Sequence, residues 1–164
     1  MRQGFTLVEL VIVITIIGII SGVIGFVLLG TVDAWTFKFN RADLLSDGRL
    51  AANRMVREIR EIKDPTSVIM ASPSQFRFAN TGNIDITYAV SGSALNRTAD
   101  GISNALAEDV TSLTFTYYDS GGGVIPSPVV SPGVTDIARV LIDIALTKNG
   151  ENVYVESQSV PRNF

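Results

Sequence analysis

Residues 4–29 read GFTLVELVIVITIIGIISGVIGFVLL, and this stretch decides the class of the whole chain. From Leu10 to Leu29 there is no charged side chain, and one carboxylate, Glu9, stands just before the run. A helix of about 20 apolar residues crosses the roughly 30 Å hydrocarbon core of a bilayer, so the run predicts a membrane span. A carboxylate at the centre of such a span costs about 2.5 to 3.5 kcal/mol. Glu9 therefore requires a partner.

The residues around the start of the run resemble a known processing signal. Gly4-Phe5-Thr6-Leu7-Val8-Glu9, after a short leader that carries Arg2, is similar to the N-terminus of type IV pilins and type II secretion pseudopilins. The resemblance implies that prepilin peptidase cleaves between Gly4 and Phe5, and that Phe5 becomes the methylated N-terminus. It also implies that Glu9 pairs with the N-terminal ammonium of a neighbouring subunit. A buried ion pair of this kind fixes register more than it adds stability.

Other interpretations of this end explain less of it. A secretory signal peptide has an apolar core of about 7 to 15 residues with a small-residue cleavage site after it, whereas this run is longer and no such site follows. A lipoprotein would need a cysteine, and the chain has none. An ordinary single-span anchor explains the hydrophobicity but neither Glu9 nor the Gly4-Phe5 junction. A glutamate that reaches up to the headgroups is the remaining alternative for Glu9.

Small residues recur at four-residue spacing inside the apolar run. Gly18 and Gly22 form one pair, and Ser21 and Gly25 form a second. Such spacing lets helix backbones approach closely in lipid, so these residues are candidates for helix packing. Two alternatives stay open, because glycine is common in membrane helices and because it weakens a helix by about 0.8 to 1 kcal/mol relative to alanine.

The helical pattern continues beyond the apolar run. Apolar residues return at spacings of three, four and seven, which predicts an amphipathic helix; they are Leu44, Leu45, Ala52, Met55, Val56, Ile59 and Ile62. Asp64-Pro65 signals the end, because proline pushes the residue before it out of the helical region. We therefore expect one helix over residues 5–63, bent at Gly30, Asp33 or Gly48.

Charged residues on this helix have two interpretations. Arg54 with Glu58, and Arg57 with Glu61, stand four residues apart, so a solvated face with weak ion pairs is expected. A patch that contacts neighbouring subunits is the alternative.

From Thr66 onward the composition changes to strands and turns. Runs rich in Val, Ile, Thr and aromatic residues predict six strands, over residues 67–71, 75–79, 84–90, 110–118, 137–147 and 152–160. Asn149-Gly150 suits a type I′ hairpin turn, and the glycines and prolines of residues 120–133 predict a loop. A short helical turn is expected over residues 102–109. The predicted fold is α+β, with one long N-terminal helix packed on a mainly antiparallel sheet domain.

These patterns divide the chain into four parts. They are a leader (residues 1–4), a membrane and filament-core helix (5–30), its amphipathic continuation (31–63) and a β-sheet domain (64–164).

The later part is similar to J-type minor pseudopilins and related minor type IV pilins. The resemblance rests on Leu44-Leu45-Ser46-Asp47, on residues 54–60, on residues 113–119 and on Val160-Pro161-Arg162-Asn163. Many major type IVa pilins close a C-terminal loop with a disulfide, which a chain without cysteine cannot do. The resemblance therefore favours a minor subunit.

Composition argues against catalysis. The chain has no histidine and no cysteine, so the commonest general base and the thiol nucleophile are missing. Gly121-Gly122-Gly123 does not match a phosphate-binding P-loop, because no helix and no phosphate-binding lysine follow it.

A net charge of -3 offers no basic field for nucleic acid. No cofactor is expected. Asp119 is the weak candidate for calcium, against the simpler role of a turn aspartate.

The expected function is therefore structural. The chain is expected to be a minor pilin or pseudopilin that helps to initiate assembly near the tip of a type IV pilus or type II secretion pseudopilus. Its expected partners are prepilin peptidase, other pilin or pseudopilin subunits, the inner-membrane assembly platform and, before assembly, membrane lipid. It would cross the bacterial inner membrane once, with the N-terminus in the cytoplasm, and later enter the filament. A displayed adhesin or substrate-binding module, with the 120–133 loop as its site, is the alternative.

Overall fold

A long helix and two antiparallel sheets make up the protein. The computed structural model describes residues 6–134 and 136–164, without the side chains of residues 29–37 and 134. Helix α1 runs from Leu7 to Arg60. The chain forms two compact units, Met1–Phe39 and Asn40–Phe164. The predicted α+β fold, with its long N-terminal helix and antiparallel sheets, is confirmed.

The first unit contains the apolar half of α1. Leu7–Leu28 is long and apolar enough to cross a membrane. Its large apolar side chains are all exposed within the unit. Leu7 at one end and Phe26 near the other are each 80% exposed. Apolar side chains on every face of a helix are expected where lipid or other helices replace water.

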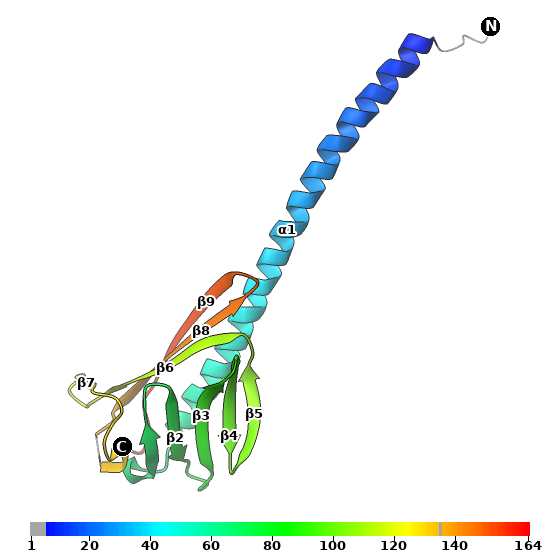
Figure 1. Ribbon diagram of the computed structural model, residues 1–164. Helices are drawn as coiled ribbons and strands as arrows, with labels where there is room; N and C mark the ends of the chain where they lie inside the picture. The colour runs from blue at the N-terminus through cyan, green and yellow to red at the C-terminus, as the bar shows by residue number, and fades with distance from the viewer. Residues whose placement is uncertain (1–5, 135) are drawn as a thin grey trace. The chain divides into compact units, whose positions relative to one another are not determined.

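A five-stranded sheet begins the fold of the second unit (Figure 1). After a short 3-10 turn, η1 (Pro65–Ser67), five strands follow one another in the order of the sequence, each antiparallel to the next. They are β1 (Val68–Ala71), β2 (Gln75–Ala79), β3 (Asp85–Ser91), β4 (Ala94–Ala99) and β5 (Ile102–Ala107).

A four-stranded antiparallel sheet completes the unit, with the order β7-β6-β8-β9. Its strands are β6 (Val110–Tyr118), β7 (Val124–Ile125), β8 (Arg139–Lys148) and β9 (Glu151–Ser159). Asn149 and Gly150 join β8 to β9 with φ of 50° and 83°. Both angles are positive, as a type I′ turn requires, so the predicted hairpin is confirmed.

Two features between β3 and β6 differ from the sequence predictions. The expected helical turn over residues 102–109 is instead strand β5, which pairs with a strand that the pattern did not predict, β4. The turn between them, Asp100-Gly101, has φ of 48° and 84° and closes a tight hairpin. The strands lack clear alternation, and β5 contains alanine and leucine, which favour helix. Pairing across the sheet decides their structure.

The 120–133 segment is also more ordered than a plain loop. It contributes β7 and part of a second 3-10 turn, η2 (Pro132–Val134). The N–H of Val129 donates to the carbonyl oxygen of Ala71 at 2.8 Å, and the Val129 side chain is buried. The segment therefore packs along the free edge of β1.

One face of α1 and both sheets share a single core. Leu44, Met55, Ile59 and Ile62 are buried, as their spacing predicts. The ring of Phe76 on β2 lies 5.7 Å from Phe115 and 5.5 Å from Tyr117 on β6, centre to centre, and so joins the two sheets. Apolar burial of this kind contributes about 25 cal/mol per Å² and holds the unit together.

Gly48 lets α1 approach the second sheet closely. A Cβ atom at this position would lie 2.8 Å from Val155 Cγ2 and 2.9 Å from Leu146 Cδ1. An added Cβ would require these two side-chain methyl groups to shift, so glycine allows the close approach, whereas the sequence suggested only a bend.

The C-terminal residues fasten the end of α1. The hydroxyl of Ser159 donates to the carbonyl oxygen of Val56 at 2.9 Å, and Asn163 Nδ2 donates to that of Ile62 at 2.8 Å. Carbonyl groups at a helix end have no partner inside the helix, and the N–H of Arg162 caps one of them by donating to the Arg60 carbonyl oxygen at 3.4 Å. The helix ends at Arg60, three residues before the predicted end, because Ile62 forms a β-bridge with Asn80.

Candidate functional site

The described part of the processing region begins with a capped helix end. The N–H of Glu9 donates to Thr6 Oγ1 at 3.3 Å, and the N–H of Leu10 donates to the Thr6 carbonyl oxygen at 3.2 Å. Threonine followed three residues later by glutamate is the spacing of a capping box. This cap was not among the predictions from sequence, although its spacing is visible there.

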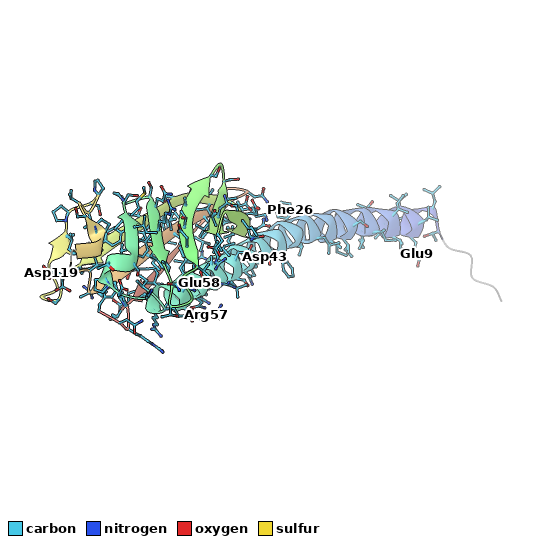
Figure 2. The ribbon with its side chains drawn as sticks, turned by 90° about the horizontal axis from the view of Figure 1, so that it is seen from below. Glu9, Phe26, Asp43, Arg57, Glu58 and Asp119 are labelled. Atoms are coloured by element: carbon cyan, nitrogen blue, oxygen red, sulfur yellow. The ribbon has the colours of Figure 1, made fainter. Side chains whose placement is uncertain are left out.

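Glu9 lies in the first turn of α1 and is exposed within its unit (Figure 2). The positive end of the helix dipole favours a carboxylate there. Within the described residues, Glu9 takes part in no ion pair. Gly4 and Phe5, the predicted processing residues, lie outside the described part of the chain.

The small residues of the apolar helix face open space. A Cβ atom at Gly18, Gly22 or Gly25 would meet no atom within 4 Å, and Ser21 is exposed. No contact inside the unit requires glycine at these positions. Their role in packing against other helices stays a prediction.

Comparison with protein families places this N-terminus. Residues 1–30 match the family model described as the prokaryotic N-terminal methylation motif. The match supports a type IV prepilin-like N-terminus. The match covers the predicted cleavage site, Glu9 and the apolar run, and it supports processing by prepilin peptidase and assembly with other pilin subunits. A search of curated proteins found no match.

The second unit contains a buried charge cluster centred on Glu58. Glu58 is only 5% exposed, so the predicted solvated face is wrong at this position. Its carboxylate accepts hydrogen bonds from Arg97 Nε at 2.8 Å, from the Tyr88 hydroxyl at 2.5 Å and from Arg54. The cluster joins α1 to β3 and β4.

Burial and hydrogen bonding oppose each other at Glu58. Burial raises the pKa of the carboxyl, but hydrogen bonds from Arg97, Tyr88 and Arg54 outweigh it and hold the pKa below its ordinary value of 4.5. Burial, and then the bond to Glu58, raises the pKa of the Tyr88 hydroxyl far above its ordinary value. The cluster is therefore ionised at Glu58 and neutral at Tyr88 around neutral pH.

Of the two predicted ion pairs along α1, one is present. Arg54 pairs with Glu58, as the four-residue spacing predicts. Arg57 and Glu61 are both exposed and form no ion pair with each other in the described chain. Figure 2 shows Arg57 next to Glu58 on the part of α1 that belongs to the second unit. Arg57 is thus a charged group without an ion-pair partner inside the described unit.

Two hollows flank the outer side of α1. Leu50, Ala51, Asn53, Arg54 and Arg57 line the first together with Leu106 of β5. The second lies on the side of β9 and shares Asn53 with the first; it is lined by Leu45, Arg49, Asn53, Tyr154, Val155, Glu156 and Ser157.

Asp119 supports its own turn. Its Oδ1 accepts the N–H of Gly123 at 2.7 Å, and its own N–H donates to the Gly123 carbonyl oxygen at 2.9 Å. This is the expected role of a turn aspartate. Among the described residues, no group of three or more acidic, histidine or cysteine side chains could hold a metal ion. The expectation that the chain binds no calcium stays a prediction.

Proposed function

We propose that this chain is a minor pilin or pseudopilin that helps to start assembly of a type IV pilus or type II secretion pseudopilus. The observation that carries the proposal is the methylation motif over residues 1–30, which includes an exposed apolar stretch of helix of 22 residues, Leu7–Leu28. Before assembly, the helix anchors the chain in the inner membrane, with the N-terminus in the cytoplasm. After assembly, it lies among the helices of other subunits.

Glu9 supplies the specificity of this assembly step. After cleavage behind Gly4, the new ammonium group at Phe5 of one subunit meets the Glu9 carboxylate of its neighbour. In apolar surroundings neither charge has a better partner, so only one stagger of the two helices satisfies both. The glycines at 18, 22 and 25 then allow close approach of the neighbouring backbone.

The position near the filament tip rests on the resemblance to J-type subunits. Leu44, Met55 and Ile59, from the motifs that carry this resemblance, belong to the core of the second unit, and the N–H of Arg162 caps the end of α1 at the Arg60 carbonyl oxygen. A rigid unit of this kind is suited to stacking beneath another subunit.

The first test is the mass of the mature N-terminus. In cells that contain prepilin peptidase, we expect a chain that begins at Phe5 and carries one additional methyl group. A chain that still begins at Met1 would contradict the proposal. Replacing Gly4 with leucine should block cleavage and serves as the control for processing.

The second test separates processing from assembly. Glu9→Leu should leave cleavage unchanged and lower recovery of the subunit in sheared filaments at least tenfold, since loss of one member of a buried pair costs about 3 to 5 kcal/mol. Glu9→Asp keeps the charge and is the matched control. Normal recovery of Glu9→Leu in filaments would overturn the role of Glu9. In a separate variant that lacks the 120–133 loop, normal filaments that have lost a binding activity would instead favour a displayed adhesin.

A further inference from the structure

The two sheets have four edge strands, and three of them are protected against pairing with another chain. The 120–133 segment bonds to the edge of β1 through Val129. Strand β7 has only two residues. Strand β9 carries Glu151 and the exposed Glu156. Cover, short length and charge are the usual ways in which proteins block edge-to-edge association.

The fourth edge strand, β5, has none of these three protections, and it pairs regularly with β4 over residues 102–105, before a register shift at Leu106. Its six residues, Ile-Ser-Asn-Ala-Leu-Ala, include no charge and no proline, and the first charge comes after the strand, at Glu108. Residues 102–105 are all exposed, with Ile102 at 69%. An uncharged, exposed edge strand is a template for pairing unless it has a partner.

The hairpin register shows which main-chain groups are available. Asp100-Gly101 forms a two-residue turn, and Ala99 stands opposite Ile102. In such a hairpin the residues beside the turn bond to each other, and every second residue turns its N–H and C=O outward. Ser103 and Ala105 therefore present these groups at the free edge of β5.

A charged hollow lies beside this edge. Leu106 of β5 and Leu50 of α1 supply apolar walls, and Arg54 and Arg57 supply positive charge. Arg54 shares Glu58 with Arg97, so one carboxylate serves two guanidinium groups. In the described chain, neither Glu61 nor Glu108 forms an ion pair with Arg54 or Arg57. The hollow thus has excess positive charge.

We propose that β5 is a docking edge for an extended, acidic segment of a neighbouring filament subunit. The segment adds a sixth strand, which bonds to the main chain of Ser103 and Ala105. One of its carboxylate side chains reaches Arg57, and an adjacent apolar side chain packs between Leu50 and Leu106. The proposal rests on the proposed function for the source of the segment.

Charge argues for a different subunit and against a second copy of this chain. Two copies paired through β5 would bring Arg54 and Arg57 of both copies to one seam. Strand β5 itself has no acidic side chain to neutralise them. A partner strand with its own carboxylate would bond to the main chain of β5 and also neutralise the positive charge of the hollow.

Substitutions at the edge and in the hollow test the proposal in the full chain. Ala105→Pro removes an outward N–H without removing a bond to β4, because proline is tolerated where the N–H faces away from the sheet. We expect recovery in sheared filaments to fall at least tenfold. Ala105→Val keeps the N–H and should be recovered normally. Arg57→Glu should match the loss seen for Ala105→Pro, whereas Arg60→Glu, at an exposed position outside the hollow, should not.

Hydrogen exchange of the unaltered chain gives a measurement that does not depend on any variant. In filaments, the amides of Ser103 and Ala105 should exchange at least tenfold more slowly than in the detergent-solubilised chain. Unprotected amides, or normal recovery of both Ala105→Pro and Arg57→Glu, would overturn the docking edge.

A thiol crosslink identifies the occupant. The chain has no cysteine, so Ser103→Cys would carry its only thiol. A maleimide-linked photocrosslinker attached to this thiol needs no thiol on the partner. In intact cells the crosslink should join a strand of a different prepilin-like subunit. A crosslink to a second copy, or to a helix, would contradict the proposal. If the unaltered chain never enters filaments, the proposed function fails as well, whereas normal entry with an unprotected edge overturns the docking edge alone.

Discussion

At the scale of single residues, Glu58 has the most demanding environment in the second unit. A carboxylate that is 5% exposed is retained because three side chains, Arg97, Tyr88 and Arg54, donate to it. In the described part of the chain, every buried side-chain nitrogen and oxygen atom has a hydrogen-bond partner. This network positions α1 on β3 and β4. Removing the Glu58 carboxylate would leave the largely buried guanidinium of Arg97 without its ion-pair partner.

Glu58→Gln tests this network. The amide nearly preserves the shape of the side chain but removes the charge that balances Arg97, whose side chain is only 15% exposed. Breaking a buried pair in this way costs about 3 to 5 kcal/mol, so we expect the midpoint of urea unfolding to fall clearly. Glu61→Gln, at an exposed position on the same helix, is the matched control and should change the free energy of unfolding by less than about 0.5 kcal/mol.

The same residue predicts how stability responds to acid. The pKa of Glu58 in the folded chain lies below its ordinary value of 4.5, so the unfolded chain binds the proton more tightly. Its contribution is complete above pH of about 4.5 and is lost as the pH falls through the lower pKa of the folded chain. The free energy of unfolding should therefore decline below pH of about 4.5. The decline should be smaller in Glu58→Gln; an equal decline would place the acid sensitivity elsewhere.

At the scale of elements, the approach of α1 to β8 and β9 depends on Gly48. In the middle of an exposed helix, glycine to alanine would gain about 1 kcal/mol. Here the added Cβ would meet Val155 and Leu146 at less than 3 Å, and overpacking a core costs about 1 to 3 kcal/mol. The helix gain and the packing cost thus act in opposite directions.

We expect the packing cost to outweigh the helix gain, so that Gly48→Ala lowers the thermal unfolding midpoint. Val155→Ala in the same chain should relieve part of the clash, and a double-mutant cycle measures this coupling. Additive effects of the two substitutions would show that the close approach is not what requires glycine.

At the scale of the whole molecule, the second unit has a core of its own. Among the described residues, every buried core residue lies between Leu44 and Val155, and Leu7–Leu28 contributes none of them. A unit with its own core can fold alone. A chain reduced to residues 40–164 should therefore remain folded without detergent.

Circular dichroism and a cooperative thermal transition would check this expectation. The reduced chain should show both helix and strand signals and should unfold near the temperature of the second unit in the full chain. Loss of the cooperative transition would mean that residues 1–39 contribute to the core. Docking at β5 uses residues of the second unit alone, so it should survive this truncation.

Local signals in the sequence determined much of this protein. The apolar run, the amphipathic spacing of Met55 and Ile59, and the Asn149-Gly150 turn each depend on neighbours within a few residues, so they can be read without a structure. The capping pattern of Thr6 and Glu9 was equally readable.

Only the tertiary structure decided the rest. The burial of Glu58 depends on Tyr88 and Arg97, which lie 30 and 39 residues away in the sequence. Strand β5 forms because β4 pairs with it, against the helical preference of its alanines and leucine. Gly48 is needed because β8 and β9 lie against it. The physical reason is common to all three: burial and strand pairing are properties of distant segments brought together, and no short stretch of sequence contains them.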